Sequence, residues 1–331
     1  MRPSAPCVCT SAVTPICESW QAAPTAEVLS LLHGECTRWS VDLGWDLARD
    51  WAAVEPARRA GLLAGWVVRG TDRQPRGWAF GVDIDGERQV GAVVADDADT
   101  AQQLMHTLTA DTSVRRALAF VRTTEVVTPD LLRAHGFEVQ PFAYLVAPTG
   151  GASIDADTWR AQDRIATADL LMRAYVDDRS LRPFARQGTP ADWLDYVDAL
   201  TMRPGCGVFS PQCSVVIREG RRLLGVALVT SIGPTTAHLA QLAVAPEARG
   251  RGRAQTLLAA ARANADRVLR ASRISLLVST ANTPALTLYA RAGFRHAGDF
   301  VAASLCGERE SVTLRGGIAG GAGRVVEGAG L

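Results

Sequence analysis

The stretch Leu239-Ala-Gln-Leu-Ala-Val-Ala-Pro-Glu-Ala-Arg-Gly-Arg-Gly-Arg-Ala-Gln-Thr-Leu-Leu258 decides the fold of this 331-residue chain. It begins as an apolar strand, turns at Pro246, passes through an Arg/Gly loop and ends in a helical pattern. Gly250 and Gly252 let the backbone approach a ligand closely, and the free amides at a helix N-terminus favour an anion. The arginines at 249, 251 and 253 suit phosphate oxygens. The stretch therefore predicts a site for a pyrophosphate-bearing cofactor.

Other interpretations of the same loop are weaker. A dinucleotide fingerprint needs a third glycine where this chain has Thr256, and it belongs after a first strand. An Arg-Gly tract that binds RNA would be longer. If this loop bound RNA, its affinity for RNA would depend strongly on salt concentration. A solvated surface turn is the ordinary alternative for an Arg/Gly turn. A second motif further along the chain decides against it.

That second motif is an apolar strand at 274–278 followed by Asn282-Thr-Pro-Ala-Leu-Thr-Leu-Tyr-Ala-Arg-Ala-Gly-Phe294. Together the two segments resemble the GNAT superfamily of N-acetyltransferases. The resemblance rests on R-x-x-G-x-A at Arg249, Gly252 and Ala254, and on N-x-x-A-x-x-x-Y-x-x-x-G-F from Asn282 to Phe294. It is specific over residues 230–304.

The resemblance implies acetyl-CoA as co-substrate. The five histidines never pair at the spacing of metal ligands, so we expect no metal. The implied pyrophosphate loop comprises Arg249, Gly250, Arg251, Gly252, Arg253 and Ala254, although the family usually has an apolar residue at the position of Arg253. Backbone amides near Leu242, Ala243 and Val244 would hold the pantetheine arm and the thioester carbonyl. Asn282 and Ala285 would lie near that arm, while an N-cap for the helix at Pro284 explains Asn282 equally well.

The implied chemistry is direct attack of a neutral primary amine on the thioester, which requires the amine to lose a proton. Tyr289 matches the family's tyrosine and is our candidate general acid for the departing thiolate; its alternative role is to fill the core. His238 opens the strand where family members often place a catalytic glutamate, so it is our candidate base, directly or through a water. Its alternative is a partly buried structural histidine. A non-catalytic acyl-CoA-binding or regulatory module would need the loop but neither side chain.

Two tandem acetyltransferase-like domains explain the order of elements, each a twisted mixed sheet flanked by helices in an α/β fold (α+β with a mixed sheet). Both halves end in a helix, a Gly-Phe pair and a strand, and the pairs at 136 and 293 lie 157 residues apart. We expect a loose lead-in at 1–25, a degenerate domain at 26–147, a linker at 148–153, the catalytic domain at 154–306 and a disordered Gly-rich tail at 307–331.

The first half lacks both parts of the predicted site. In place of the Arg/Gly loop it has Ala95-Asp-Asp-Ala-Asp99, whose carboxylates would repel a pyrophosphate, and in place of Tyr289 it has Leu132. It also holds most of the tryptophans, which could line an acceptor pocket but more commonly pack in cores. These are Trp20, Trp39, Trp45, Trp51, Trp66 and Trp78.

Local patterns place the elements. Strands are expected at 66–68, 78–82, 89–95, 118–122, 142–146, 214–218, 223–230, 238–244, 274–278 and 300–304. Helices are expected at 101–108, 129–134, 158–175, 190–200, 255–268 and 284–292. Acceptor recognition would fall near Tyr175–Tyr196, including Asp177, Asp178, Arg182 and Phe184.

Composition removes several classes of function. All 35 basic residues are arginine, which excludes a Schiff-base, P-loop or kinase lysine, and the net charge of +1 gives no global field for nucleic acid or membrane. No apolar run approaches a membrane span, and seven scattered cysteines suit a reducing compartment. We therefore expect a cytoplasmic protein without nucleic acid or membrane partners, and the resemblance implies a small-molecule or peptide amine as its partner.

Overall fold

The computed structural model describes residues 16–84, 86–110, 116–151, 156–176, 185, 188–202 and 206–306. The first half contains β1 (Ile16–Ser19), η1 (Trp20–Ala22), α1 (Thr25–Leu43), η2 (Asp50–Ala53), α2 (Val54–Arg59), β2 (Ala64–Arg69), β3 (Pro75–Ile84), β4 (Glu87–Ala95), α3 (Ala98–Ala110), β5 (Arg116–Arg122), α4 (Pro129–Ala134) and β6 (Glu138–Pro148). The second half contains β7 (Asp157–Thr158), η3 (Ala161–Asp163), α5 (Arg164–Ala174), α6 (Pro190–Met202), β8 (Val208–Phe209), β9 (Val215–Glu219), β10 (Arg222–Gly233), β11 (Thr236–Val244), η5 (Pro246–Ala248), α7 (Arg253–Leu269), β12 (Arg273–Ser279), α8 (Thr283–Arg291) and β13 (Arg295–Cys306).

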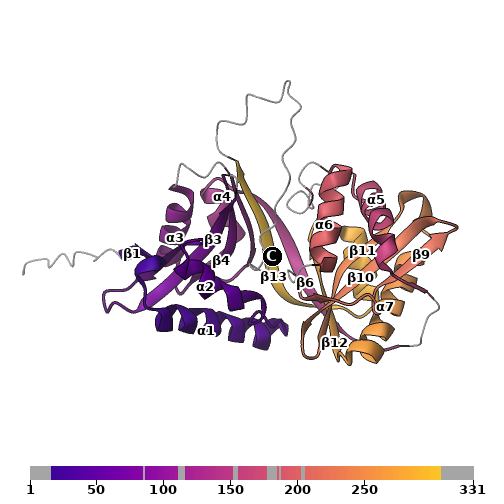
Figure 1. Ribbon diagram of the computed structural model, residues 1–331, viewed down its shortest axis with the longest axis horizontal. Coiled ribbons are helices and arrows are strands. Elements are labelled where there is room, and N and C mark those ends of the chain that lie inside the picture. The colour runs from indigo at the N-terminus through magenta and orange to yellow at the C-terminus, as the bar shows by residue number, and fades with distance from the viewer. Residues whose placement is uncertain are drawn as a thin grey trace, which may run out of the picture.

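The two halves share one mixed sheet because they exchange their closing strands. The strand order is β1-β2-β3-β4-β5-β13-β6-β12-β11-β10-β9-β7, with β8 paired to β10. The last strand of the second half, β13, thus lies between β5 and β6, while β6 of the first half lies between β12 and β13. Figure 1 shows the yellow β13 and the magenta β6 crossing between the two lobes. The fold class is the mixed α/β arrangement predicted, yet neither half completes its own sheet.

The Gly-Phe repeat marks equivalent turns in the two halves. Gly136 and Gly293 both have a positive φ, 84° and 83°, which explains the glycine at each position. The phenylalanine amide donates to the carbonyl of Leu132 in one half and of Tyr289 in the other, at 3.1 and 3.0 Å. Leu132 and Tyr289 therefore occupy equivalent backbone positions, as the sequence alignment of the halves predicts.

Helices cover both faces of the second half of the sheet. Leu171 of α5 and Val197 of α6 pack on Leu228 of β10, and Leu257 of α7 packs on the opposite face with Val229. Successive residues of β10 thus face opposite sides, as strand geometry requires. The face under α5 and α6 also carries the side chain of Thr230.

Three sequence expectations differ from the structure. The lead-in contains β1, whose pairing with the distant β2 no local pattern reveals. The 19-residue α1 was not expected, because Gly34 and the buried Glu35 interrupt its apolar stripe. The helix expected at 158–175 begins only at Arg164, since Trp159 lies in an extended segment that bonds to Ser214.

Some expectations fall outside the described residues. These are the first fifteen residues, the last two residues of the linker, the tail from 307 and the acceptor candidates Asp177, Asp178, Arg182 and Phe184. Among the helices that the structure does describe, none has the length and apolarity to cross a bilayer.

Candidate functional site

The central strands of the second half separate after a short stretch of pairing. β11 and β12 are parallel neighbours only from Thr236–His238 to Arg273–Ser275. On its other side β11 stays paired with β10. A bulge opposite Leu228/Val229 bends β11 there. The edge of β11 that carries Leu242 and Val244 is consequently not paired with β12, which leaves backbone amides of this edge available to a ligand in the gap.

The Arg/Gly loop follows directly from this separated strand. Gly250 and Gly252 have φ of 74° and 72°, and Gly252 is the N-cap of the 17-residue α7. Among the described residues, no atom lies within 4 Å of the space in which a side chain at Gly250 would lie, and the single neighbour of that space at Gly252 is the Gln255 amide oxygen, 3.9 Å away. The loop thus presents an open helix N-terminus, the geometry that binds phosphate groups.

The three loop arginines differ in role. Arg249 donates from Nε to the Val244 carbonyl (3.2 Å) and from Nη2 to the Ala174 carbonyl (2.7 Å), so it fastens the loop to β11 and α5. Arg251 is exposed and Arg253 half-buried, and neither has a hydrogen bond or ion pair within the described residues. Two of the three predicted phosphate contacts therefore remain unengaged.

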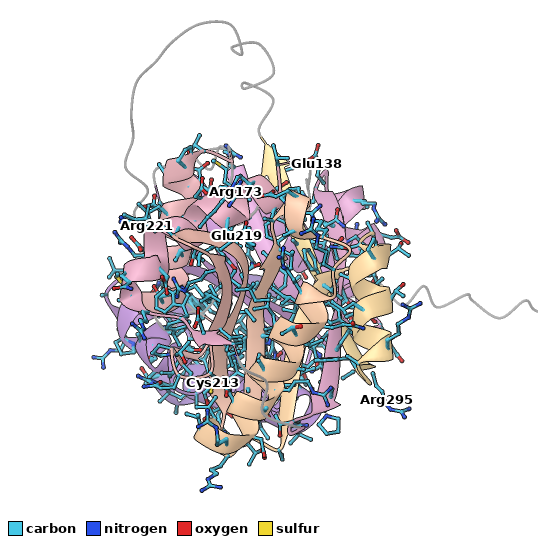
Figure 2. All side chains as sticks on the ribbon, turned by 90° about the vertical axis from the view of Figure 1, so that its right-hand side faces the viewer. Glu138, Arg173, Cys213, Glu219, Arg221 and Arg295 are labelled. Carbon is cyan, nitrogen blue, oxygen red and sulfur yellow. The ribbon has the colours of Figure 1, made fainter. Side chains whose placement is uncertain are left out.

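A neighbouring carboxylate in the turn is neutralised by arginines. Glu247 pairs with Arg173 at 3.1 Å and with Arg222 at 2.7 Å, and Figure 2 labels Arg173 on the second half. These ion pairs connect the turn to α5 and to β10. An anion at the loop would meet no unpaired negative charge from this residue.

Tyr289 lies in the core of the second half. Tyr289 is 7% exposed, and the centroid of its ring lies 5.5 Å from that of Phe294 with an angle of 57° between the ring planes. The hydroxyl makes no hydrogen bond to any described residue, and burial raises the pKa of Tyr289. The hydroxyl therefore stays protonated at neutral pH, as a proton donor must, while the ring packs like any core aromatic.

His238 is more deeply buried than a solvent-linked base would be. Its residue is 3% exposed, its Nδ1 lies 2.9 Å from Ser275 Oγ, and its ring packs against Trp45 and Tyr144 at 5.1 and 6.4 Å. Burial lowers the pKa of His238 to about 3. The near-neutral pKa expected from sequence does not describe this environment, because desolvation disfavours the imidazolium.

Asn282 acts as a helix cap. Its side-chain oxygen accepts a hydrogen bond from the Ala285 amide at 3.1 Å, which satisfies one free donor at the start of α8. The local alternative raised by the sequence is thus present in the structure. The expected contact of Asn282 and Ala285 with a pantetheine arm remains a prediction.

A polar network missed by sequence reasoning spans α5, α6 and β11. The hydroxyl of Tyr175 donates to Gln241 Oε1 at 3.1 Å and to the Leu242 carbonyl at 3.0 Å, and Gln241 Nε2 donates to the Tyr196 hydroxyl at 2.6 Å. A glutamine inside the apolar strand 239–244 is the available sequence signal. The network fixes the separated part of β11 against the two helices.

The first half repeats the strand separation without the loop. β4 and β5 pair only from Glu87–Val90 to Arg116–Ala119, again with a bulge on the neighbouring ladder. Asp97 Oδ1 caps α3 by accepting from the Thr100 amide at 2.8 Å, and Leu132 is 1% exposed. A cavity of about 300 Å³ lies at this separation, lined among others by Glu35, Trp39 and Asp96.

Known proteins resemble this chain in sequence and in fold. Residues 169–294 match the family model described as the acetyltransferase (GNAT) family. A search of curated proteins gave no match. The fold is similar to a GCN5-related N-acetyltransferase from Sphaerobacter thermophilus, with 17% identity, a TM-score of 0.57, and coverage of 88% of this chain and 95% of that chain.

Two further solved structures cover the same share of this chain. A GNAT-family acetyltransferase from Colwellia psychrerythraea is 14% identical, with a TM-score of 0.50 and 99% of that chain covered. A glucosamine N-acetyltransferase region of a fungal multi-domain β-N-acetylglucosaminidase is also 14% identical, with a TM-score of 0.51 and 38% of that chain covered. At such identities the likeness shows the fold, and it extends over both halves. The family match adds the assignment of the second half: the chain contains an acetyltransferase domain of the GNAT family.

Proposed function

We propose that this protein transfers the acetyl group of acetyl-CoA to a primary amine acceptor by direct attack. The observation that carries the proposal is the open, glycine-built N-terminus of α7, which directly follows the separated edge of β11. An anion cradle next to unpaired strand backbone suits a ligand with a pyrophosphate at one end and an amide-bearing arm at the other. Family membership of the second half supports acyl transfer in general.

The residues present fit acetyl-CoA. In the proposal, amides at Gly250 and Gly252 and the side chains of Arg251 and Arg253 hold the pyrophosphate. The pantetheine arm lies along Leu242–Val244, and Arg249 keeps loop and strand together through its bonds to Val244 and Ala174. The arm would then direct the thioester toward the polar network at Gln241.

The proposed reaction conserves atoms and charge. The acceptor ammonium loses one proton, its nitrogen lone pair attacks the thioester carbon, and backbone amides stabilise the oxyanion. Collapse forms the amide, breaks the C–S bond and releases a second nitrogen proton, while Tyr289 protonates the departing thiolate and is then reprotonated. His238 enters this proposal as a neutral imidazole that relays a proton through a water, since a pKa of about 3 prevents it from holding one.

The test is a titration of the full chain with acetyl-CoA. We expect Gly252→Glu to weaken binding by about 100-fold or more, because a carboxylate would lie beside the pyrophosphate. Gly220→Glu is the matched control, since Gly220 also has a positive φ (57°) in an open turn of the same half. Equal affinities for wild type and Gly252→Glu would exclude this loop as the acetyl-CoA site.

Turnover separates an enzyme from a binding module. Free-thiol release in the presence of a panel of primary amines is expected for the wild type, and not for Gly252→Glu at the same acetyl-CoA concentration. Acetyl-CoA binding without thiol release from any amine would favour a non-catalytic acyl-CoA-binding or regulatory module instead.

A further inference from the structure

A segment of the first half, residues 44–53, lies against the second half of the sheet. The Asp46 amide donates to the Ile232 carbonyl at 2.6 Å, and a side-chain carbon at Gly233 would lie 2.5 Å from the Gly44 carbonyl oxygen. The Trp45 ring lies 5.1 Å from the ring of His238. Because His238 pairs across the strands with Thr230, this contact is on the face that α5 and α6 cover.

Two buried polar atoms at this contact have no partner. Neither the Trp45 indole nitrogen nor the Thr230 hydroxyl forms a hydrogen bond within the described part of the chain. Buried polar groups are nearly always hydrogen-bonded in native proteins, to protein or to an ordered water or ligand. A donor from the first half and a hydroxyl from the second, both beside His238, therefore indicate that a polar molecule belongs between the halves.

Asp50 adds an unpaired negative charge to the same segment. Its residue is 6% exposed, and its carboxylate forms neither a hydrogen bond nor an ion pair with any described residue. Other buried carboxylates are paired: Glu55 with Arg58 at 2.5 Å and Asp163 with Arg218 at 2.8 Å. Leaving a buried carboxylate without a cation is costly, so its retention favours a cationic ligand.

Contacts at the same boundary place this segment beside β10 and the turn that follows Cys206. The Asp46 amide donates to the Ile232 carbonyl, and a side-chain carbon at Gly207 would lie 2.3 Å from the Ser231 carbonyl oxygen. The next residue, Val208, pairs with Ser231 in the sheet. Burial raises the pKa of Asp50 to about 6, with Arg49 opposing and Asp46 adding to the shift.

We infer that Asp50 of the first half receives the ammonium group of the acceptor, so that the acceptor site is built from both halves of the chain. This inference rests on the proposed acetyl transfer. Trp45 and Thr230 supply a donor and a hydroxyl for the acceptor's other polar groups, and the indole ring supplies an apolar wall. The ligand class is a primary amine on an apolar body, held as its cation until the carboxylate takes one proton.

The proton balance is complete with Asp50 as acceptor. The ammonium N–H bond breaks, its proton passes to the carboxylate of Asp50 in place of the water relay at His238, and the freed lone pair attacks the thioester carbon. The proton later leaves Asp50 to solvent, so each turnover releases amide, CoA thiol and one proton. A carboxyl with a raised pKa is a better proton acceptor than an ordinary aspartate.

Calorimetric titration with 2-phenylethylamine, in the presence of CoA, tests the inference without requiring turnover. We expect Asp50→Asn to weaken amine binding at least tenfold while leaving the Kd of CoA unchanged. The neutral analogue 2-phenylethanol is expected to bind both proteins equally. Asp130→Asn is the matched control, because Asp130 lies in the same half with its side chain 91% exposed.

The dependence on pH gives a second measure. Amine affinity is expected to fall as the pH drops through about 6, the pKa of Asp50. The groups that face it are Arg49, Asp46, Cys36 and Cys206, and the two thiols have pKa values near 11 and stay neutral. Asp50→Asn should remove this dependence.

Equal amine affinities for wild type and Asp50→Asn, or no binding of 2-phenylethylamine by wild type, would overturn the assignment of Asp50. Failure of the proposed function looks different: CoA does not bind, or the amine binds through Asp50 and no amide forms from acetyl-CoA. Asparagine has nearly the size of aspartate, and an unchanged circular dichroism spectrum would show that the variant is folded.

Discussion

The two strand separations of this molecule share a backbone plan and differ in electrostatics. In each half a parallel pair parts after three or four residues, beside a bulge. After β11 the chain continues into two glycines with positive φ and two unengaged arginines; after β4 it continues into Asp96, Asp97 and Asp99. The backbone thus creates a gap twice, and only the loop chemistry makes one of them suitable for a pyrophosphate.

The pair Leu132 and Tyr289 extends this contrast into the core. Both carbonyls accept the same Gly-Phe turn hydrogen bond, yet one side chain is aliphatic and the other has a hydroxyl without a partner among the described residues. An unused hydroxyl in a core has no stabilising role there, which favours a chemical role for Tyr289 and a purely structural one for Leu132.

Truncating Leu132 is expected to give the largest effect and to leave the cofactor site intact. Leu132→Ala should lower the free energy of unfolding by about 3–4 kcal/mol, because the residue is 1% exposed and its loss leaves a cavity. Urea unfolding measures this, with acetyl-CoA affinity of the folded variant as the companion measurement. A large loss of that affinity would show that the first half takes part in cofactor binding.

Removing the hydroxyl of Tyr289, at the equivalent position of the second half, should lower activity and leave stability unchanged. Tyr289→Phe is expected to lower kcat by about 100-fold, equivalent to about 2.7 kcal/mol, since a general acid is lost. Acetyl-CoA affinity and thermal stability should remain close to wild type because the hydroxyl has no described partner. If kcat were unchanged, Tyr289 would be a core residue like Leu132.

A third expected effect concerns the boundary between the halves. The folded-state pKa of Asp50 is about 6, above its ordinary value of 3.8, so the folded protein binds the extra proton and stability falls as the pH rises between these values. Asp50→Asn should therefore stabilise the protein above pH 6, by up to about 3 kcal/mol, and have no effect below about pH 4. Thermal unfolding at both pH values measures this. A destabilised variant at pH 7 would mean that the carboxylate has a structural partner.

The exchange of the closing strands β6 and β13 connects the two halves of the molecule. Because β13 pairs with β5 and β6, and β6 with β12, removal of the first half would leave the second half without a strand between β12 and β13. The first half therefore supports the second through main-chain pairing as well as through the segment at Trp45.

Much of the site was predictable from short-range patterns. The strand, Arg/Gly loop and helix at 239–258, the cap at Asn282 and the equivalence of Leu132 with Tyr289 all follow from spacing, because backbone conformation at glycines and helix ends depends on near neighbours. The distinct role of Arg249 was not predictable, since its acceptor at Ala174 lies 75 residues away. The low pKa of His238 was missed for the same reason: Trp45 and Tyr144 come from the other half.

The sequence by itself determined the local chemistry of this protein: where a glycine-built loop suited to a phosphate stands, which half has it, and which tyrosine follows it. Only the tertiary structure decided how the halves share strands and which side chains meet at their boundary. The physical reason is that register between distant strands, and the burial of Asp50, Trp45 and His238, arise from packing between segments far apart in the chain. Desolvation and unpaired charge, which set the proposed acceptor site, exist only once those segments are together.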